Sequence, residues 1–93
     1  MPLNQQEAVR LAVKDLGSRL MIGEGDIAVD SIQPAEFPNA CLGAERAGEM
    51  CAEMLVNGWR IMLSTPSGSY EYRGARHQLR LFNYKGQNFK VYP

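Results

Sequence analysis

The chain has 93 residues, of which 45% are hydrophobic and 22% charged, and its formal net charge is zero. A chain of this length builds one domain with a modest core, and its composition excludes an intrinsically disordered protein. No apolar run approaches the roughly 20 residues that cross a bilayer, and the N-terminus lacks the basic start and apolar stretch of a signal peptide. We therefore expect a single soluble domain over residues 1–93, without a membrane span.

Charge is unevenly distributed along the chain. Residues 1–72 hold all ten acidic residues and five basic ones, whereas residues 73–93 hold five basic residues and no acidic one. The basic residues of this last segment are Arg73, Arg76, Arg80, Lys85 and Lys90. Such a chain either places a basic strand beside an acidic body or presents the basic segment to a partner.

The first predicted element is an amphipathic helix. Asn4 and Glu7 have the spacing of a capping box, and Gly17 is placed to end the helix in the left-handed conformation. The apolar residues between them recur at helical spacing: Val9, Ala12, Val13 and Leu16. This helix needs an apolar surface on which to pack.

A strand is predicted next, over Ile27–Ser31. Ile27 and Val29 alternate with polar residues and would face the core. Pro34 and Pro38 either end this strand or confine it to a sheet edge.

Residues 45–56 are ambiguous, because their Ala, Glu and Met residues favour a helix that a glycine interrupts. We expect a short helical turn near Glu45, followed by a strand over Ala52–Val56. Asn57-Gly58 is the typical sequence of a two-residue hairpin turn. It would lead into a strand with these residues on one face: Trp59, Ile61 and Leu63.

The C-terminal third predicts three further strands joined by tight turns, the first turn being Thr65–Gly68. The strands are expected at Tyr70–Arg73, Gln78–Phe82 and Phe89–Tyr92, with a turn at Lys85–Gln87 before the last one. Together these elements predict an α+β domain. One N-terminal amphipathic helix would pack on a four- to five-stranded antiparallel sheet, whose other face is partly wet.

Cys41 and Cys51 leave two interpretations open. A disulfide would close a loop of about 11 residues and contribute on the order of 2–3 kcal/mol by the chain-entropy estimate. Two free thiols in a reducing cytosol would instead be small, half-buried residues.

No other chemistry is predicted at the cysteines. A tetrahedral zinc site needs four ligands, His77 is the chain's one histidine, and the short C-x₂₋₄-C spacing is missing, so we expect no metal and no cofactor. A cysteine nucleophile would need His77 as its base, and no local catalytic motif accompanies it. We therefore predict no catalytic residue and a protein that is not an enzyme.

Three segments carry a resemblance to a known family. FPNACLG, which begins at Phe37, GEMCAEMLVNGWRI and YEYR are similar to segments of small bacterial domains of unknown function. Those domains share a W/F-P-x-x-C/S-L-G loop, a G-x-x-C element and a Y-x-Y strand. The resemblance covers roughly residues 5–82; Phe37 replaces a common Trp and Asn57 a common Pro. In that family the two cysteine positions occur together, often after a secretion or lipoprotein signal, which implies a disulfide in an oxidising compartment. The family has no established activity, so the resemblance supplies no catalytic residue.

The leading functional hypothesis is a non-enzymatic, protein-binding or inhibitor-like module. It would present the Phe37–Cys51 loop, closed by a Cys41–Cys51 disulfide, to a protein partner. A stiff loop loses less entropy when a complex forms. The residues expected to contact the partner are Phe37, Leu42 and Met50, of which Leu42 and Met50 suit a core equally well.

The alternative is binding of nucleic acid or another acidic partner through the basic and aromatic strands of residues 70–92. A total charge of zero is a poor footprint for strong phosphate affinity. The sequence leaves the compartment open: secreted or periplasmic if the disulfide forms, and cytoplasmic otherwise. It permits a monomer or a dimer paired through an edge strand such as Phe89–Tyr92.

Overall fold

The structure is a computed structural model of the chain and describes residues 2–93. In chain order the elements are α1 (Gln5–Leu20), the short 3₁₀ helix η1 (Glu24–Asp26), β1 (Ala28–Phe37), β2 (Val56–Thr65), β3 (Gly68–Ala75), β4 (Gln78–Tyr84) and β5 (Gln87–Tyr92). Within this described part of the chain, no helix is long and apolar enough to span a membrane.

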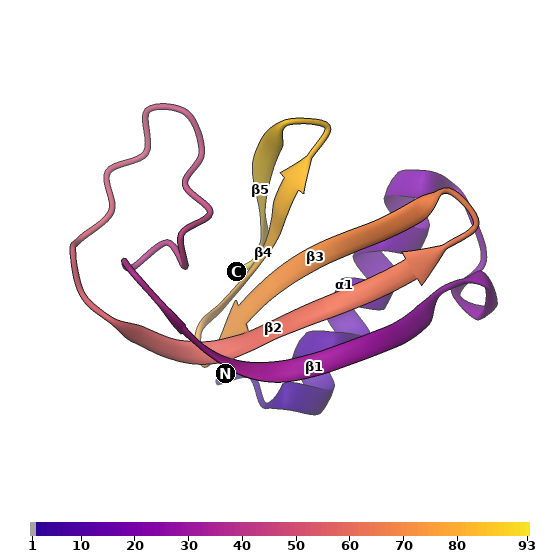
Figure 1. Cartoon of the computed structure of the whole chain (residues 1–93), viewed down its shortest axis with the longest axis horizontal. Helices are drawn as coiled ribbons and strands as arrows, with labels where there is room; N and C mark the ends of the chain where they lie inside the picture. Colours follow the sequence, from indigo (N-terminus) through magenta and orange to yellow (C-terminus); the bar gives the residue numbers. More distant parts are fainter. Residues whose placement is uncertain (1) are drawn as a thin grey trace.

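The five strands form one antiparallel sheet in which each strand pairs with the next in sequence. α1 lies across one face of the sheet (Figure 1). Residues 38–55, which we call the cysteine loop, join β1 to β2 and stand at one end of the sheet beside the β4–β5 hairpin (Figure 1). The predicted α+β fold of one helix on an antiparallel sheet is confirmed.

The three C-terminal strands are also confirmed, since the predicted segments lie within β3, β4 and β5. The predicted turn Thr65–Gly68 joins β2 to β3, and its Thr65 hydroxyl accepts a hydrogen bond from the N–H of Ser67 (3.1 Å). A tight turn closed by its own side chain sets the register of the hairpin locally. This part of the fold therefore needed no long-range information.

α1 begins as predicted and ends later than predicted. Asn4 accepts a hydrogen bond from the N–H of Glu7 (2.8 Å), and Glu7 accepts one from the N–H of Asn4 (3.3 Å), which completes the capping box. The predicted end at Gly17 is wrong, because Met21 takes the left-handed cap with φ 56°. Gly17 is buried, and a Cβ there would lie 3.2 Å from the carbonyl oxygen of Ile22. Because Gly17 has no side chain, the backbone at Ile22, just after the helix, can pass close to it.

The main core lies between α1 and the sheet. Tyr72 is its largest fully buried side chain and donates a hydrogen bond to Asp15 of α1 (2.7 Å). Burial, together with this bond, raises the pKa of Tyr72 well above its usual range. The other fully buried residues of this core are Ala8, Ala12, Leu16, Ile61, Leu63, Leu79 and Leu81. The predicted face of Trp59, Ile61 and Leu63 is therefore confirmed as the core face of β2.

β1 is an edge strand that runs through Pro34, so the second of the two sequence alternatives is confirmed. Its register with β2 shifts between Val29 and Ser31, which marks a bulge. The prediction that Val29 faces the core is wrong: it is 43% exposed, because α1 packs mainly against β2 to β5. Ile27, in contrast, packs on the main core as predicted.

The hairpin predicted at Asn57-Gly58 is wrong. Both residues lie inside β2, opposite Glu36 and Ala35 of β1. A Cβ at Gly58 would collide with the carbonyl oxygen of Gly74 in β3. The glycine permits the close approach of β3, and pairing with β1 overrides the local turn signal.

The variant Gly58→Ala is expected to lower the free energy of unfolding by roughly 3 kcal/mol, because the backbone of β3 must move to admit the new methyl group. Urea unfolding followed by Trp59 fluorescence measures this change. Gly25→Ala is the matched control, since an added Cβ there has no neighbour within 4 Å. A cost for Gly58→Ala no larger than that of the control would contradict the steric explanation.

The cysteine loop is irregular along its described length. Turns at residues 40–43 and 47–48 replace the helical turn predicted near Glu45. The strand predicted over Ala52–Val56 is also wrong, because β2 begins only at Val56. Contacts from the sheet, rather than the loop's own propensities, decide this conformation.

Candidate interaction site at the disulfide-closed loop

Cys41 and Cys51 form a disulfide, with 5.7 Å between their Cα atoms, so the predicted pairing is confirmed. Cys41 is buried and Cys51 half-buried. Beside the disulfide, the N–H of Ala40 donates a hydrogen bond to the carbonyl of Ala52 (2.9 Å). The two ends of the closed segment are thus joined twice, once covalently and once through the backbone.

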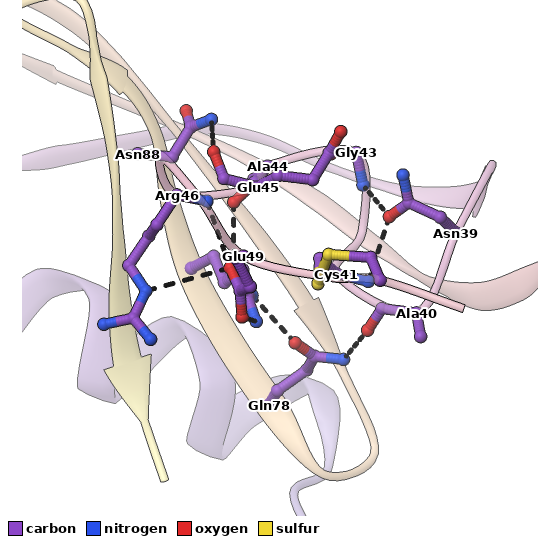
Figure 2. The surroundings of a disulfide bond; sticks show 12 residues. Asn39, Ala40, Cys41, Gly43, Ala44, Glu45, Arg46, Glu49, Gln78 and Asn88 are labelled. Atoms are coloured by element: carbon purple, nitrogen blue, oxygen red, sulfur yellow. Dashed lines mark hydrogen bonds and ion pairs between the residues drawn. A yellow bond between two sulfur atoms is a disulfide. The ribbon is translucent and has the colours of Figure 1, made fainter. Parts of the chain in front are cut away.

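Side chains of the sheet hold the cysteine loop through its backbone carbonyls (Figure 2). The accepting carbonyls are those of Ala40, Leu42, Gly43, Ala44 and Glu45, and the donors are Gln78, Arg73, Arg80 and Asn88. Arg73 and Arg80 alternate along their strands with residues of the main core, so they project from the sheet face opposite α1. The loop backbone is therefore fixed on that face.

Arg80 is the central contact and is only 3% exposed. Its guanidinium pairs with both carboxylate oxygens of Glu49, Nη1 to Oε1 at 2.6 Å and Nη2 to Oε2 at 2.8 Å. It also donates to the Gln78 side chain (2.9 Å) and to the Ala44 carbonyl (3.2 Å). The hydrogen bonds from Arg80, and then from the N–H of Arg46, lower the pKa of Glu49 from 4.5 to about 2.

This pKa predicts loss of stability in acid. The pKa of Glu49 is lower in the folded protein, so its contribution is complete above pH 4.5 and is lost as the pH falls toward about 2. Urea midpoints measured between pH 7 and pH 2 should fall in that window, and the fall should be smaller in Glu49→Gln. Glu53→Gln, an exposed residue of the same loop, is the control. An identical acid profile for wild type and Glu49→Gln would contradict the assignment.

Arg73 is the second contact and is half-buried. It donates to the carbonyls of Leu42 (3.0 Å) and Gly43 (3.1 Å) and to the carboxylate of Glu71 (2.7 Å). Its guanidinium lies over the ring of Phe82, 3.6 Å from the centroid. Gly43 has φ 66°, and a Cβ there would lie 2.8 Å from Arg73 Nη1, so both the backbone conformation and the Arg73 contact favour glycine at this position.

The structure separates the three residues expected to contact a partner. Phe37 and Leu42 are buried and form a second small core with Ala75. Their side chains pack inside the protein, where a partner does not reach them. Met50 is 95% exposed, and the expectation of partner contact is therefore kept for Met50.

Two exposed apolar residues were missed by the sequence analysis. Met54 and Leu55 are 55% and 68% exposed and lie between Cys51 and the start of β2. Both residues fall within the strand predicted over Ala52–Val56, so the sequence did not identify them as exposed. Alternation cannot identify exposed residues in a segment that forms no strand.

The five basic residues of the alternative surface do not lie together on the outside. Arg73 and Arg80 point inward to the cysteine loop, as described above. Arg76, Lys85 and Lys90 are exposed. The basic segment thus uses two of its five cations within the molecule, which weakens it as a phosphate-binding surface.

A hollow of about 550 Å³ lies beside the disulfide. It is lined by Pro38, Asn39, Glu45, Glu49, Met50, Cys51 and Glu53. The disulfide is therefore reachable from outside through Cys51, the more exposed of the two cysteines. His77, the residue considered as a base, is exposed at the β3–β4 turn.

The fold and the fixed loop define a small α+β domain with a disulfide-closed connection between its first two strands. Residues 9–82 match a family described as a domain of unknown function, DUF8738, and the chain belongs to that family. The match ends within β4, so β5 lies outside it. A search of curated proteins and a search of solved structures found no match.

Proposed function

We propose that the protein is a non-enzymatic, inhibitor-like protein-binding module whose cysteine loop contacts the partner. One contrast supports this proposal: the loop backbone is held by the sheet, while three of the loop's large apolar side chains are exposed. The exposed side chains are Met50, Met54 and Leu55.

A rigid loop with exposed apolar residues suits protein binding for two physical reasons. The disulfide and the bonds from Arg73 and Arg80 order the backbone before a partner arrives, which reduces the entropy lost on binding. Methionine side chains are flexible and polarisable, so they adapt to the shape of an apolar surface. The backbone would thus supply position and the side chains would supply contact area.

The disulfide also fits a protein that works in an oxidising compartment, where a partner would be secreted or displayed. Binding of nucleic acid through the basic strands stays as the competing hypothesis. Its distinguishing sign is a complex with short oligonucleotides that weakens steeply as salt is added.

Site-specific photo-crosslinking tests the proposed function. A photoreactive phenylalanine analogue replaces Met50 in one variant and Met21 in a control variant, since Met21 is 90% exposed on α1's C-terminal cap. Extract of the source organism is then irradiated with each variant under non-reducing conditions. We expect one discrete protein adduct from position 50, removed by excess unlabelled protein and absent from position 21.

A second variant locates the contact. Met54→Ser with Leu55→Ser removes two exposed apolar side chains and should abolish the adduct formed at position 50 without changing the melting temperature. No adduct at position 50, or the same adduct at position 21, would contradict a binding role for the cysteine loop.

A further inference from the structure

Glu49 lies beside the disulfide (Figure 2) and is also hydrogen-bonded to Arg80. One of its carboxylate oxygens and the sulfur atoms of Cys41 and Cys51 all lie within 4.8 Å of one another. Two thiols and a carboxylate form a ligand set that suits Zn²⁺. His77, the third ligand suggested by the sequence, is not in this cluster, and Glu49 stands in its place.

We propose that opening the disulfide creates a zinc site in which the thiolates of Cys41 and Cys51 and the carboxylate of Glu49 bind one Zn²⁺ ion. A water molecule would take the fourth position of the tetrahedron. The disulfide and the zinc site exclude each other, because the metal needs both sulfurs as thiolates. The loop therefore has two alternative closures, one oxidised and one metal-bound.

The switch between the two closures needs a reductant. A cellular dithiol transfers two electrons and two protons to the disulfide and itself becomes a disulfide, leaving two thiols on the protein. Binding of Zn²⁺ then releases the two thiol protons to water. Oxidation in the reverse direction expels the ion.

The required movement is small. With Zn–S bonds of about 2.3 Å and a Zn–O bond of about 2.0 Å, tetrahedral angles place the sulfurs about 3.8 Å apart and each about 3.5 Å from the oxygen. These separations fall within the present 4.8 Å cluster. The two sulfur atoms must move apart once their bond is broken, and the Glu49 oxygen must lie about 3.5 Å from each of them.

Glu49 can bind an ion while it keeps its bond to Arg80. Its Oε1 accepts from Arg80 and from the N–H of Arg46, whereas Oε2 accepts one hydrogen bond, from Arg80 Nη2. A carboxylate oxygen has two lone pairs, so Oε2 has one to offer a metal. Metal-binding carboxylates are themselves commonly held by such hydrogen bonds.

Charge balance also favours the site. Two thiolates, one carboxylate and Zn²⁺ leave one negative charge, which the buried guanidinium of Arg80 compensates. The hollow of about 550 Å³ reaches Glu49 and Cys51, which gives the ion an access route and leaves space for the fourth, water ligand. An isolated buried cation without these partners would be unfavourable.

Cobalt binding to the full chain tests the proposal. The protein is reduced without oxygen by a phosphine, which takes the oxygen of a water molecule while the disulfide becomes two thiols, and Co²⁺ is then added. We expect near-ultraviolet thiolate-to-cobalt absorption and the visible bands of a tetrahedral ion, complete at one equivalent and removed by Zn²⁺. The oxidised protein should show neither. Absence of these bands from the reduced protein would overturn the proposal.

Matched variants assign the third ligand. Glu49→Gln should weaken Co²⁺ binding at least ~10-fold, whereas Glu53→Gln, which lines the same hollow outside the three-residue cluster, should leave it unchanged. Equal effects of the two substitutions would contradict a role for Glu49.

X-ray absorption spectroscopy of the zinc-bound wild type identifies the atoms that bind the ion. It uses no variant, so its result does not depend on whether a variant folds. We expect two sulfur neighbours at about 2.3 Å and oxygen neighbours at about 2.0 Å. Three or more sulfur neighbours would mean an ion shared between chains and would overturn the site.

Discussion

Replacing Arg80 with alanine is expected to lower the free energy of unfolding by roughly 3–5 kcal/mol, the range found when one partner of a buried ion pair is removed. Arg80 is 3% exposed and pairs with Glu49 through two short bonds. Without it, the carboxylate of Glu49 and the carbonyl of Ala44 lose their donors on the sheet face. Few other single changes in this chain would remove as many bonds.

Thermal unfolding measures this effect, and the expected fall in melting temperature is on the order of 15 °C for a domain of this size. Arg76→Ala is the control, because Arg76 is an exposed arginine at the turn that precedes β4. It should change the melting temperature little. If the two substitutions had similar small effects, Arg80 would not be the residue that holds the cysteine loop.

The helix and the meander of strands could be predicted because their signals are local. The Asn4–Glu7 capping box and the alternation of Ile61 and Leu63 involve residues a few positions apart. Tight turns then bring consecutive strands together without long-range information. The fold class followed from these local patterns alone.

The errors in the prediction have long-range causes. Asn57-Gly58 is typical of a turn, yet β1 pairs with both residues and β3 packs closely against Gly58, so they form the start of a long strand. Val29 alternates as a core residue would, yet α1 is too narrow to cover the edge strand as well. Neither the neighbouring strands nor the width of the helix is visible in the local sequence.

The site was only partly predictable for a related reason. The cysteine pair and the closed loop were recognised from spacing and resemblance, and the disulfide is present. An arginine that alternates along a strand normally points to solvent, so nothing near Arg73 or Arg80 indicates that a loop from 30 residues or more away will cover them. Packing of the loop on the sheet also buries Leu42, which belongs to the loop itself. Tertiary contacts, which the local sequence does not show, therefore decide which of these side chains are exposed.

Removal of the disulfide, as Cys41→Ala with Cys51→Ala, is expected to lower the free energy of unfolding by about 3 kcal/mol, the chain-entropy value for a loop of this length. Urea unfolding of the oxidised wild type and the double variant measures it. The cysteine loop should remain docked in the variant at neutral pH, because Arg80 still binds Glu49 and Gln78 still binds Ala40. Hydrogen exchange at residues 40–49 should therefore rise only moderately.

The disulfide and Arg80 act on the same loop, so their contributions should not be additive. In the protein that lacks the disulfide, Arg80→Ala should cost less than in the wild type, because the freed loop can move outward and hydrate Glu49. A double-mutant cycle over the four proteins gives this coupling, expected at roughly 0.5–3 kcal/mol. Strict additivity would show that the disulfide orders only residues 41–51 among themselves, and that the attachment of the loop by Arg80 does not depend on it. Coupling of the expected sign would show that closure of the loop and its attachment to the sheet depend on each other, which is the arrangement that a preordered binding loop requires.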